Sequence, residues 1–123
     1  MSKLTRAEIE RVLPLKPTPE QAKLLIADDG FEHYLDGANI DVFADQVVKP
    51  LREVVDRGGK SWRSFALLLC IDCVGGDSRK YKQWLAMPEI MHVGSLIIDD
   101  IQDKSETRRG GPSWYVVHIL LFL

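Results

Sequence analysis

The sequence has few cysteines and little net charge, and each shortage excludes a class of protein. Its 123 residues include only two cysteines, too few for a disulfide-stabilised secreted scaffold, so a reducing compartment is expected. The formal net charge is −2, which gives the whole molecule no attraction for nucleic acid or for an anionic membrane. Any site for an anion must therefore be local.

Long apolar segments are also missing. The longest, "WYVVHILLFL", covers residues 114–123 and is about half as long as a membrane-spanning helix requires. The N-terminus, "MSKLTRAEIE", is charged and lacks the apolar core of a signal peptide. We therefore expect a soluble, cytoplasmic protein without a membrane span.

Capping residues mark two helix starts in the first part of the chain. Thr5 with Glu8 fits a capping box, and Thr18, Pro19 and Gln21 form a second helix-start signature with proline at the first helical position. The second of these helices is expected to end at Gly30.

Three longer helices are expected in the rest of the chain, and strand signals are scarce. The first covers residues 40–56, where apolar side chains recur at helical spacing and Pro50 introduces a kink. The second, "KSWRSFALLLCIDCVGG" at 60–76, is apolar nearly all round, which predicts burial. The third runs through "WLAMPEIMHVGSLIIDD" at 84–100. The fold class predicted from these patterns is all-α.

Aspartates cluster at the end of the last predicted helix. Asp99 and Asp103 are four residues apart and share a helix face, whereas Asp100 lies roughly 100° around the helix from Asp99. Two carboxylates at this spacing can hold Mg²⁺ and leave coordination positions for phosphate oxygens. The alternative is a solvated, acidic helix end. Three aspartates at the negative end of a helix dipole are unfavourable without a cation, which favours the metal site.

Basic residues follow the last predicted helix, and others lie at the start of the predicted helix at 60–76. Arg108 and Arg109 follow the aspartates, and guanidinium groups suit phosphate oxygens. In "GGKSWRS" at 58–64, Lys60 and Arg63 lie in the first helical turn, where an anion would offset their unfavourable position. The alternative is an ordinary glycine stop followed by solvated basic residues.

Histidine and cysteine side chains in the apolar helices can be functional or merely packed. His92 lies seven residues before Asp99, on nearly the same face, so ligand binding and core packing both remain open. Cys70 and Cys73 form a CxxC pair without a second pair in the chain. We therefore predict that they pack in the core and have no redox or zinc chemistry.

Taken together, these motifs resemble those of the trans-isoprenyl diphosphate synthases, the polyprenyl synthetase family. "GGKSWRS" is similar to the family's GGKxxR motif, and "HVGSLIIDDIQDKSETRRGGPS" is similar to its first aspartate-rich region with the following arginine pair. The resemblance covers residues 47–113 and is closest to geranylgeranyl diphosphate synthases. It implies the N-terminal helices of an isoprenoid-synthase-type helical bundle, here a single partial domain over residues 1–123.

The resemblance implies a magnesium-dependent prenyltransferase. Such an enzyme condenses isopentenyl diphosphate with an allylic diphosphate to give a longer trans-prenyl diphosphate. Gly94 and Ser95, just before the first aspartate, are small residues that would leave a deep product pocket. The expected product is therefore geranylgeranyl diphosphate or a longer one.

The resemblance also implies a role for each site residue. Asp99 and Asp103 would be catalytic and bind Mg²⁺, with Asp100 as a supporting catalytic residue. Arg108 would contact the diphosphate of the allylic substrate. The diphosphate of isopentenyl diphosphate would be held by Lys60, Arg63, His92 and Arg109.

The sequence departs from the family pattern after Ser113. No second aspartate-rich motif follows, and the apolar tail at 114–123 replaces the family's polar stretch. We therefore expect a truncated domain that exposes apolar helix faces and forms a homodimer or binds a prenyl synthase partner. A non-catalytic helical subunit that regulates a prenyl diphosphate synthase is the alternative function.

Overall fold

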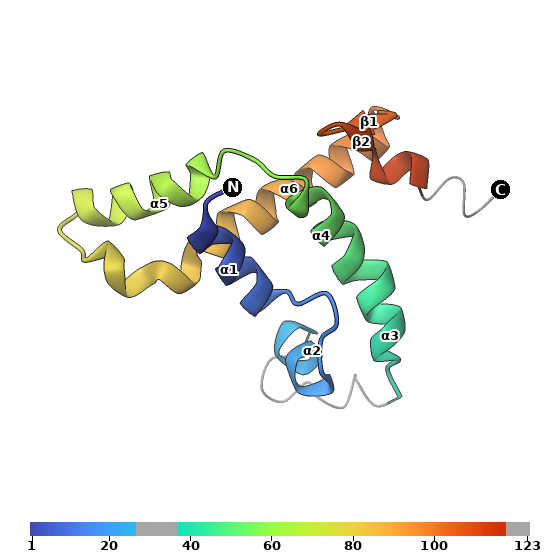
Figure 1. Cartoon of the computed structure of the whole chain (residues 1–123), viewed down its shortest axis with the longest axis horizontal. Coiled ribbons are helices and arrows are strands. Elements are labelled where there is room, and N and C mark those ends of the chain that lie inside the picture. The colour runs from blue at the N-terminus through green and yellow to red at the C-terminus, as the bar shows by residue number, and fades with distance from the viewer. Residues whose placement is uncertain (27–36, 118–123) are drawn as a thin grey trace.

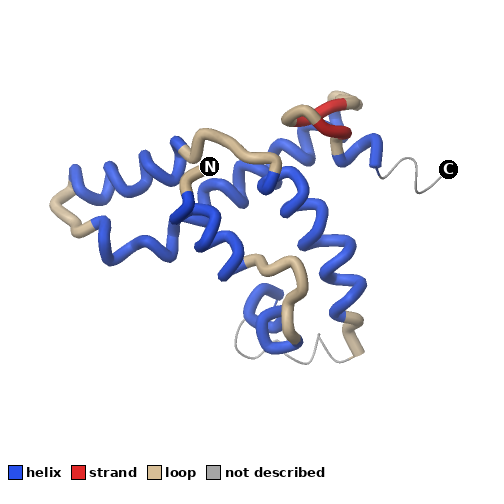
Figure 2. Tube along the Cα trace, viewed as in Figure 1, coloured by secondary structure: helices blue, strands red, loops and turns tan. Residues whose placement is uncertain are grey.

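The computed structural model describes residues 1–26 and 37–117, which are helical almost throughout (Figure 1 and Figure 2). The helices are α1 (Lys3–Val12), α2 (Pro19–Ile26), α3 (Ile40–Phe43), the π-helical turn η2 (Ala44–Val48), α4 (Lys49–Asp56), α5 (Trp62–Cys73), the 3-10 helix η3 (Ser78–Leu85) and α6 (Ala86–Gln102). Two short strands, β1 (Thr107–Arg108) and β2 (Gly111–Pro112), follow and pair antiparallel. The all-α prediction is confirmed.

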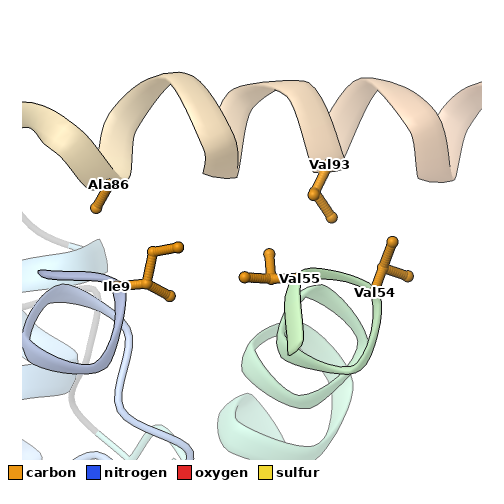
Figure 3. Close-up of a cluster of buried hydrophobic side chains, with 5 residues drawn as sticks. All are labelled: Ile9, Val54, Val55, Ala86 and Val93. Carbon is orange, nitrogen blue, oxygen red and sulfur yellow. The ribbon is translucent and has the colours of Figure 1, made fainter. Parts of the chain in front are cut away.

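The core lies where α1 and α4 meet α6, the longest helix in the described ranges. Five buried side chains point toward one another there (Figure 3): Ile9, Val54, Val55, Ala86 and Val93. Burial of such side chains is the main favourable contribution to folding. Because α4 packs against α6, the loop that follows α4 is brought beside the C-terminal half of α6.

A buried arginine joins the end of α1 to α4. Arg52 is 4% exposed, and its guanidinium donates to the backbone oxygen of Leu13 at 2.7 Å and to the carboxylates of Glu10 and Asp56. These partners offset the cost of removing the cation from water. The contact fixes the position of α4, and so of the loop that follows it.

The helix caps agree with the prediction in one case and differ in the other. At α1 the cap is Ser2, whose Oγ accepts from the backbone N–H of Thr5 at 3.1 Å, and Thr5 is buried in the first turn. At α2 the predicted helix start is present, and it has the form of a capping box: Thr18 N–H donates to Gln21 Oε1 at 2.9 Å, and Gln21 N–H donates to Thr18 Oγ1 at 3.2 Å. The predicted helix end at Gly30 lies outside the described residues.

The helix predicted over residues 40–56 is present, and its irregularity takes the form of a π-helical turn. Proline has no N–H to donate, and its ring crowds the carbonyl four residues earlier. The wider turn of η2 ends at Val48, and α4 continues from Lys49 with Pro50 in its first turn. A π-helical turn at this place relieves the contact that the proline ring would otherwise make.

The predicted burial of the apolar helix at 60–76 is wrong. Phe65 is 63% exposed and Leu69 is 48% exposed, and Cys70 and Cys73, which we expected in the core, are exposed as well. The principal contacts of α5 are with η3 and α6, which lie along one of its sides (Figure 1). Within the described part of the chain no other element packs closely on its outer face.

The apolar tail is described only in part. Residues 114–117 form a helical turn, and residues 118–123 lie outside the described ranges. Across 1–26 and 37–117, none of the helices has both the length and the apolar character needed to cross a membrane.

Candidate functional site

The three aspartates at the end of α6 have different surroundings. The side chain of Asp99 is 55% exposed, and Asp103, the C-cap residue of α6, is exposed as well. The backbone N–H of Asp103 donates to the carbonyl oxygen of Asp99 at 2.8 Å, which places the two residues one helical turn apart. Asp100 is fully buried. The two accessible carboxylates are therefore the two that were predicted to bind Mg²⁺.

Arg108 forms an ion pair with the buried Asp100. Its Nε donates to Asp100 Oδ1 at 2.8 Å and to Oδ2 at 3.1 Å, and its Nη2 donates to Asp100 Oδ1 and, at 3.5 Å, to Asp99 Oδ2. The hydrogen bond with Asp100 raises the pKa of Arg108 above its ordinary value. Asp100 thus holds Arg108 beside the exposed carboxylates, while its predicted catalytic role stays a prediction.

Arg109 reaches in another direction, to the loop that follows α4. Its Nη1 donates to the backbone oxygens of Val54 at 3.2 Å and Gly58 at 2.5 Å. A Cβ on Gly59 would stand 3.5 Å from both terminal nitrogens, so the guanidinium lies against that glycine, next to Lys60. Carbonyl groups in the last turn of a helix have no intrahelical partner. Arg109 therefore caps α4 and joins the arginine pair to the glycine loop, which is residues 58–61.

His92 lies near the positive charges of Arg63 and Arg109. Partial burial lowers the pKa of His92 first, and the positive charges of Arg63 and Arg109 lower it further. The guanidinium of Arg63 also lies over the ring of Trp62, 4.6 Å from its centroid, a favourable cation–π contact. The structure thus brings Arg63, His92 and Arg109 together. Lys60 is exposed in the glycine loop.

The carboxylates available for a metal come from one helix turn. In residues 1–26 and 37–117 no group of three or more His, Cys, Asp or Glu side chains is arranged to hold a metal ion. Mg²⁺ is commonly bound by one or two carboxylates together with water and substrate phosphates. The exposed pair Asp99 and Asp103 fits an ion of that kind, shared with a phosphorylated ligand.

The turns that carry the motifs contain left-handed residues. Ser61, Lys104 and Arg109 have φ angles of 50°, 52° and 51°, a conformation that residues with a side chain rarely adopt. Ser61 lies in the glycine loop, Lys104 directly follows the aspartates, and Arg109 lies in the hairpin between β1 and β2. Such residues are often found at binding sites, and no sequence signal marked them here.

Arg57 was also missed. Its guanidinium contacts the backbone of the hairpin at Arg108 and Pro112. The only sequence signal for Arg57 was its place directly before the glycine loop. This signal did not single it out, because an arginine at a helix end is usually taken as a solvated charge.

Comparison with known proteins identifies the family of this chain. Residues 44–119 match the family model of the polyprenyl synthetases, which is more than half of the 123 residues. The chain therefore belongs to the polyprenyl synthetase family. No solved structure matches it.

Curated relatives are similar to part of the chain. The geranylgeranyl diphosphate synthase of Methanosarcina mazei is 36% identical over 72 residues, which are 58% of this chain and 22% of that protein. The short chain isoprenyl diphosphate synthase of Methanothermobacter thermautotrophicus is 36% identical over 80 residues, 65% of this chain and 24% of that protein. The geranylgeranyl diphosphate synthase of Saccharolobus solfataricus is 39% identical over 59 residues, 48% and 18% respectively. The chain thus matches about a fifth to a quarter of the length of these relatives.

Asp100→Asn should destabilise the fold more than Asp99→Asn. The first change leaves the guanidinium of Arg108 without its buried counter-charge, and we expect the free energy of unfolding to fall by about 1–3 kcal/mol. The second changes an exposed residue and should alter it by less than about 0.5 kcal/mol. Urea unfolding followed by far-UV circular dichroism measures both. Equal losses would contradict the structural role of Asp100.

Arg63→Gln should raise the pKa of His92, because it removes one of the positive charges that lower it. The lowered pKa also means that the unfolded chain takes up the proton first as the pH falls. The folded state therefore loses stability as the pH falls below the ordinary pKa of histidine. This loss should be smaller in Arg63→Gln. NMR titration of the ring protons measures the pKa, with Arg11→Gln as the control and His92→Asn to assign the signal. An unchanged pKa in Arg63→Gln would show that the two side chains do not interact.

Proposed function

We propose that this chain carries the first diphosphate-binding part of a magnesium-dependent prenyltransferase. The reaction would join isopentenyl diphosphate to an allylic diphosphate and give a longer trans-prenyl diphosphate, geranylgeranyl or longer. The observation that carries this proposal is the arginine pair, in which Arg108 contacts the aspartates of α6 and Arg109 contacts the glycine loop. Membership of the polyprenyl synthetase family and the names of the relatives support the same reaction.

The acidic part of the site suits the allylic diphosphate. Asp99 and Asp103 would hold Mg²⁺, which draws negative charge from a departing diphosphate when it is bound. Arg108 lies within reach of Asp99, so its guanidinium can donate to oxygens of a diphosphate placed there. Asp100 would support the reaction by keeping Arg108 in this position.

The basic part suits the diphosphate of isopentenyl diphosphate. Arg63 and Arg109 bring positive charge close to His92, whose pKa is lowered first by partial burial and then by these charges. Repulsion between like charges costs free energy, and a bound anion removes that cost. The residues that would hold the diphosphate are Lys60, Arg63, His92 and Arg109. With both substrates placed, the remaining tasks are orientation, charge stabilisation and exclusion of water from the allylic cation.

A second candidate function is a non-catalytic helical subunit of a prenyl diphosphate synthase. The exposed apolar side chains favour it, since surfaces of this kind mark contacts with other proteins. Trp84, Met87 and Met91, for instance, line two neighbouring apolar hollows and are each about half exposed or more. A homodimer or prenyl synthase partner, a cytoplasmic location and the single partial domain stay predictions.

Magnesium-dependent binding of a non-hydrolysable allylic diphosphate tests the proposed enzyme function. We expect calorimetric titration of the whole chain to detect binding only with Mg²⁺. The double variant Asp99→Asn/Asp103→Asn should weaken it by at least about tenfold, since charged contacts contribute about 1.5–3 kcal/mol each.

Asp41→Asn/Asp45→Asn is the matched control, because it removes two exposed carboxylates with the same spacing. These residues lie on α3 and η2, away from the glycine loop and the hairpin (Figure 1), so binding should be unchanged. Equal weakening by both double variants, or binding that ignores Mg²⁺, would count against the proposed metal site. Absence of binding would favour the non-catalytic subunit.

A further inference from the structure

Arg57 lies at the end of α4, directly before the glycine loop, and holds the hairpin that carries the arginine pair. Its Nη1 donates to the carbonyl oxygen of Arg108 at 3.0 Å and to that of Pro112 at 2.7 Å. The first acceptor lies on β1 and the second on β2. One guanidinium therefore holds both strands of the hairpin against the end of α4.

The first of these contacts is made at the peptide bond between the two arginines. The carbonyl group of Arg108 belongs to the peptide unit that joins it to Arg109, and Arg109 has the left-handed φ of 51°. That conformation is intrinsically disfavoured, whereas a hydrogen bond from a charged donor is among the stronger ones in proteins. Arg57 thus stabilises the backbone conformation from which both arginine side chains extend.

Gly111 provides the space that Arg57 occupies. A Cβ at this position would stand 2.7 Å from Arg57 Cζ and 2.9 Å from Nη1, distances too short for atoms in contact. Gly111 is not among the glycines with a positive φ, so alanine is compatible with its backbone. The change Gly111→Ala therefore displaces the guanidinium of Arg57 and keeps every charge in the chain.

The two arginines reach different motifs from this point. Arg108 contacts Asp100 on α6, and Arg109 contacts Gly58 in the glycine loop. A shift of the peptide between them would move both guanidinium groups, and each would lose its alignment with the motif that it serves.

We propose that Arg57 is a positioning residue for diphosphate binding, which acts by fixing Arg108 and Arg109 and makes no contact with the diphosphate itself. This inference rests on the proposed function. It predicts that displacing the guanidinium of Arg57 weakens diphosphate binding as much as removing it does. It also predicts that this effect depends on Arg108 and Arg109.

Calorimetric titration of the whole chain with magnesium pyrophosphate tests this inference. We expect Arg57→Gln and Gly111→Ala each to weaken binding about tenfold. Arg109→Gln should weaken binding about tenfold alone and less than about threefold when added to Arg57→Gln, because residues that act through one another are not additive. Arg11→Gln, which removes an exposed arginine of α1, is the control and should bind as the original chain does.

Hydrogen exchange of the hairpin supplies a readout that needs no ligand. The backbone N–H of Ser113 donates to the carbonyl oxygen of Glu106 at 2.9 Å and closes the hairpin. In Arg57→Gln and Gly111→Ala this amide should exchange at least about tenfold faster, while amides of α4 and α6 keep their rates. Unchanged exchange in both variants would overturn the inference, whether or not pyrophosphate binds.

The two measurements separate the inference from the function on which it rests. If the original chain does not bind magnesium pyrophosphate, the proposed function fails, and the exchange rates alone decide the role of Arg57. If the original chain binds and Gly111→Ala binds equally well, Arg57 acts by its charge or by direct contact, and the positioning role is overturned. Full additivity of Arg57→Gln and Arg109→Gln would overturn it too.

Discussion

The ion pair between Asp100 and Arg108 fixes the path of the chain after α6, and the candidate site depends on that path. A carboxylate with no exposure is costly unless a cation and hydrogen bonds satisfy it. Arg108 supplies both, which anchors the hairpin at the helix end. Arg109 then reaches the carbonyl of Gly58, 51 residues earlier in the sequence. The aspartate motif and the glycine loop therefore form one site.

The charges in this site are sorted into two adjoining parts. Asp99 and Asp103 are exposed on the last turn of α6, where the helix dipole adds to their negative potential and favours a bound cation. Arg63 and Arg109 form the positive part around His92, whose pKa is lowered first by partial burial and then by their charges. A divalent cation with its diphosphate would complement the acidic part, and a second diphosphate would complement the positive part.

Local patterns predicted the helices and the two metal-binding candidates, because caps, proline and i,i+4 spacing act over a few residues. The helix start at Thr18 and the placement of Asp99 and Asp103 one helical turn apart are of this kind. The burial of Phe65 was predicted wrongly, since burial depends on which other segments cover a helix and not on the composition of that helix. The pairing of Asp100 with Arg108 and the contacts of Arg57 were not predictable either, because they arise only when the hairpin folds back on α4 and α6.

The central claim is that Arg108 and Arg109, on one hairpin, serve two adjoining diphosphate sites, and NMR signals of their side-chain Nε–H groups test it most directly. Adding magnesium pyrophosphate should shift both signals, while the Nε–H of Arg52, which donates to Asp56, stays unchanged. A response from only one of the two arginines, or an equal response from Arg52, would contradict the account.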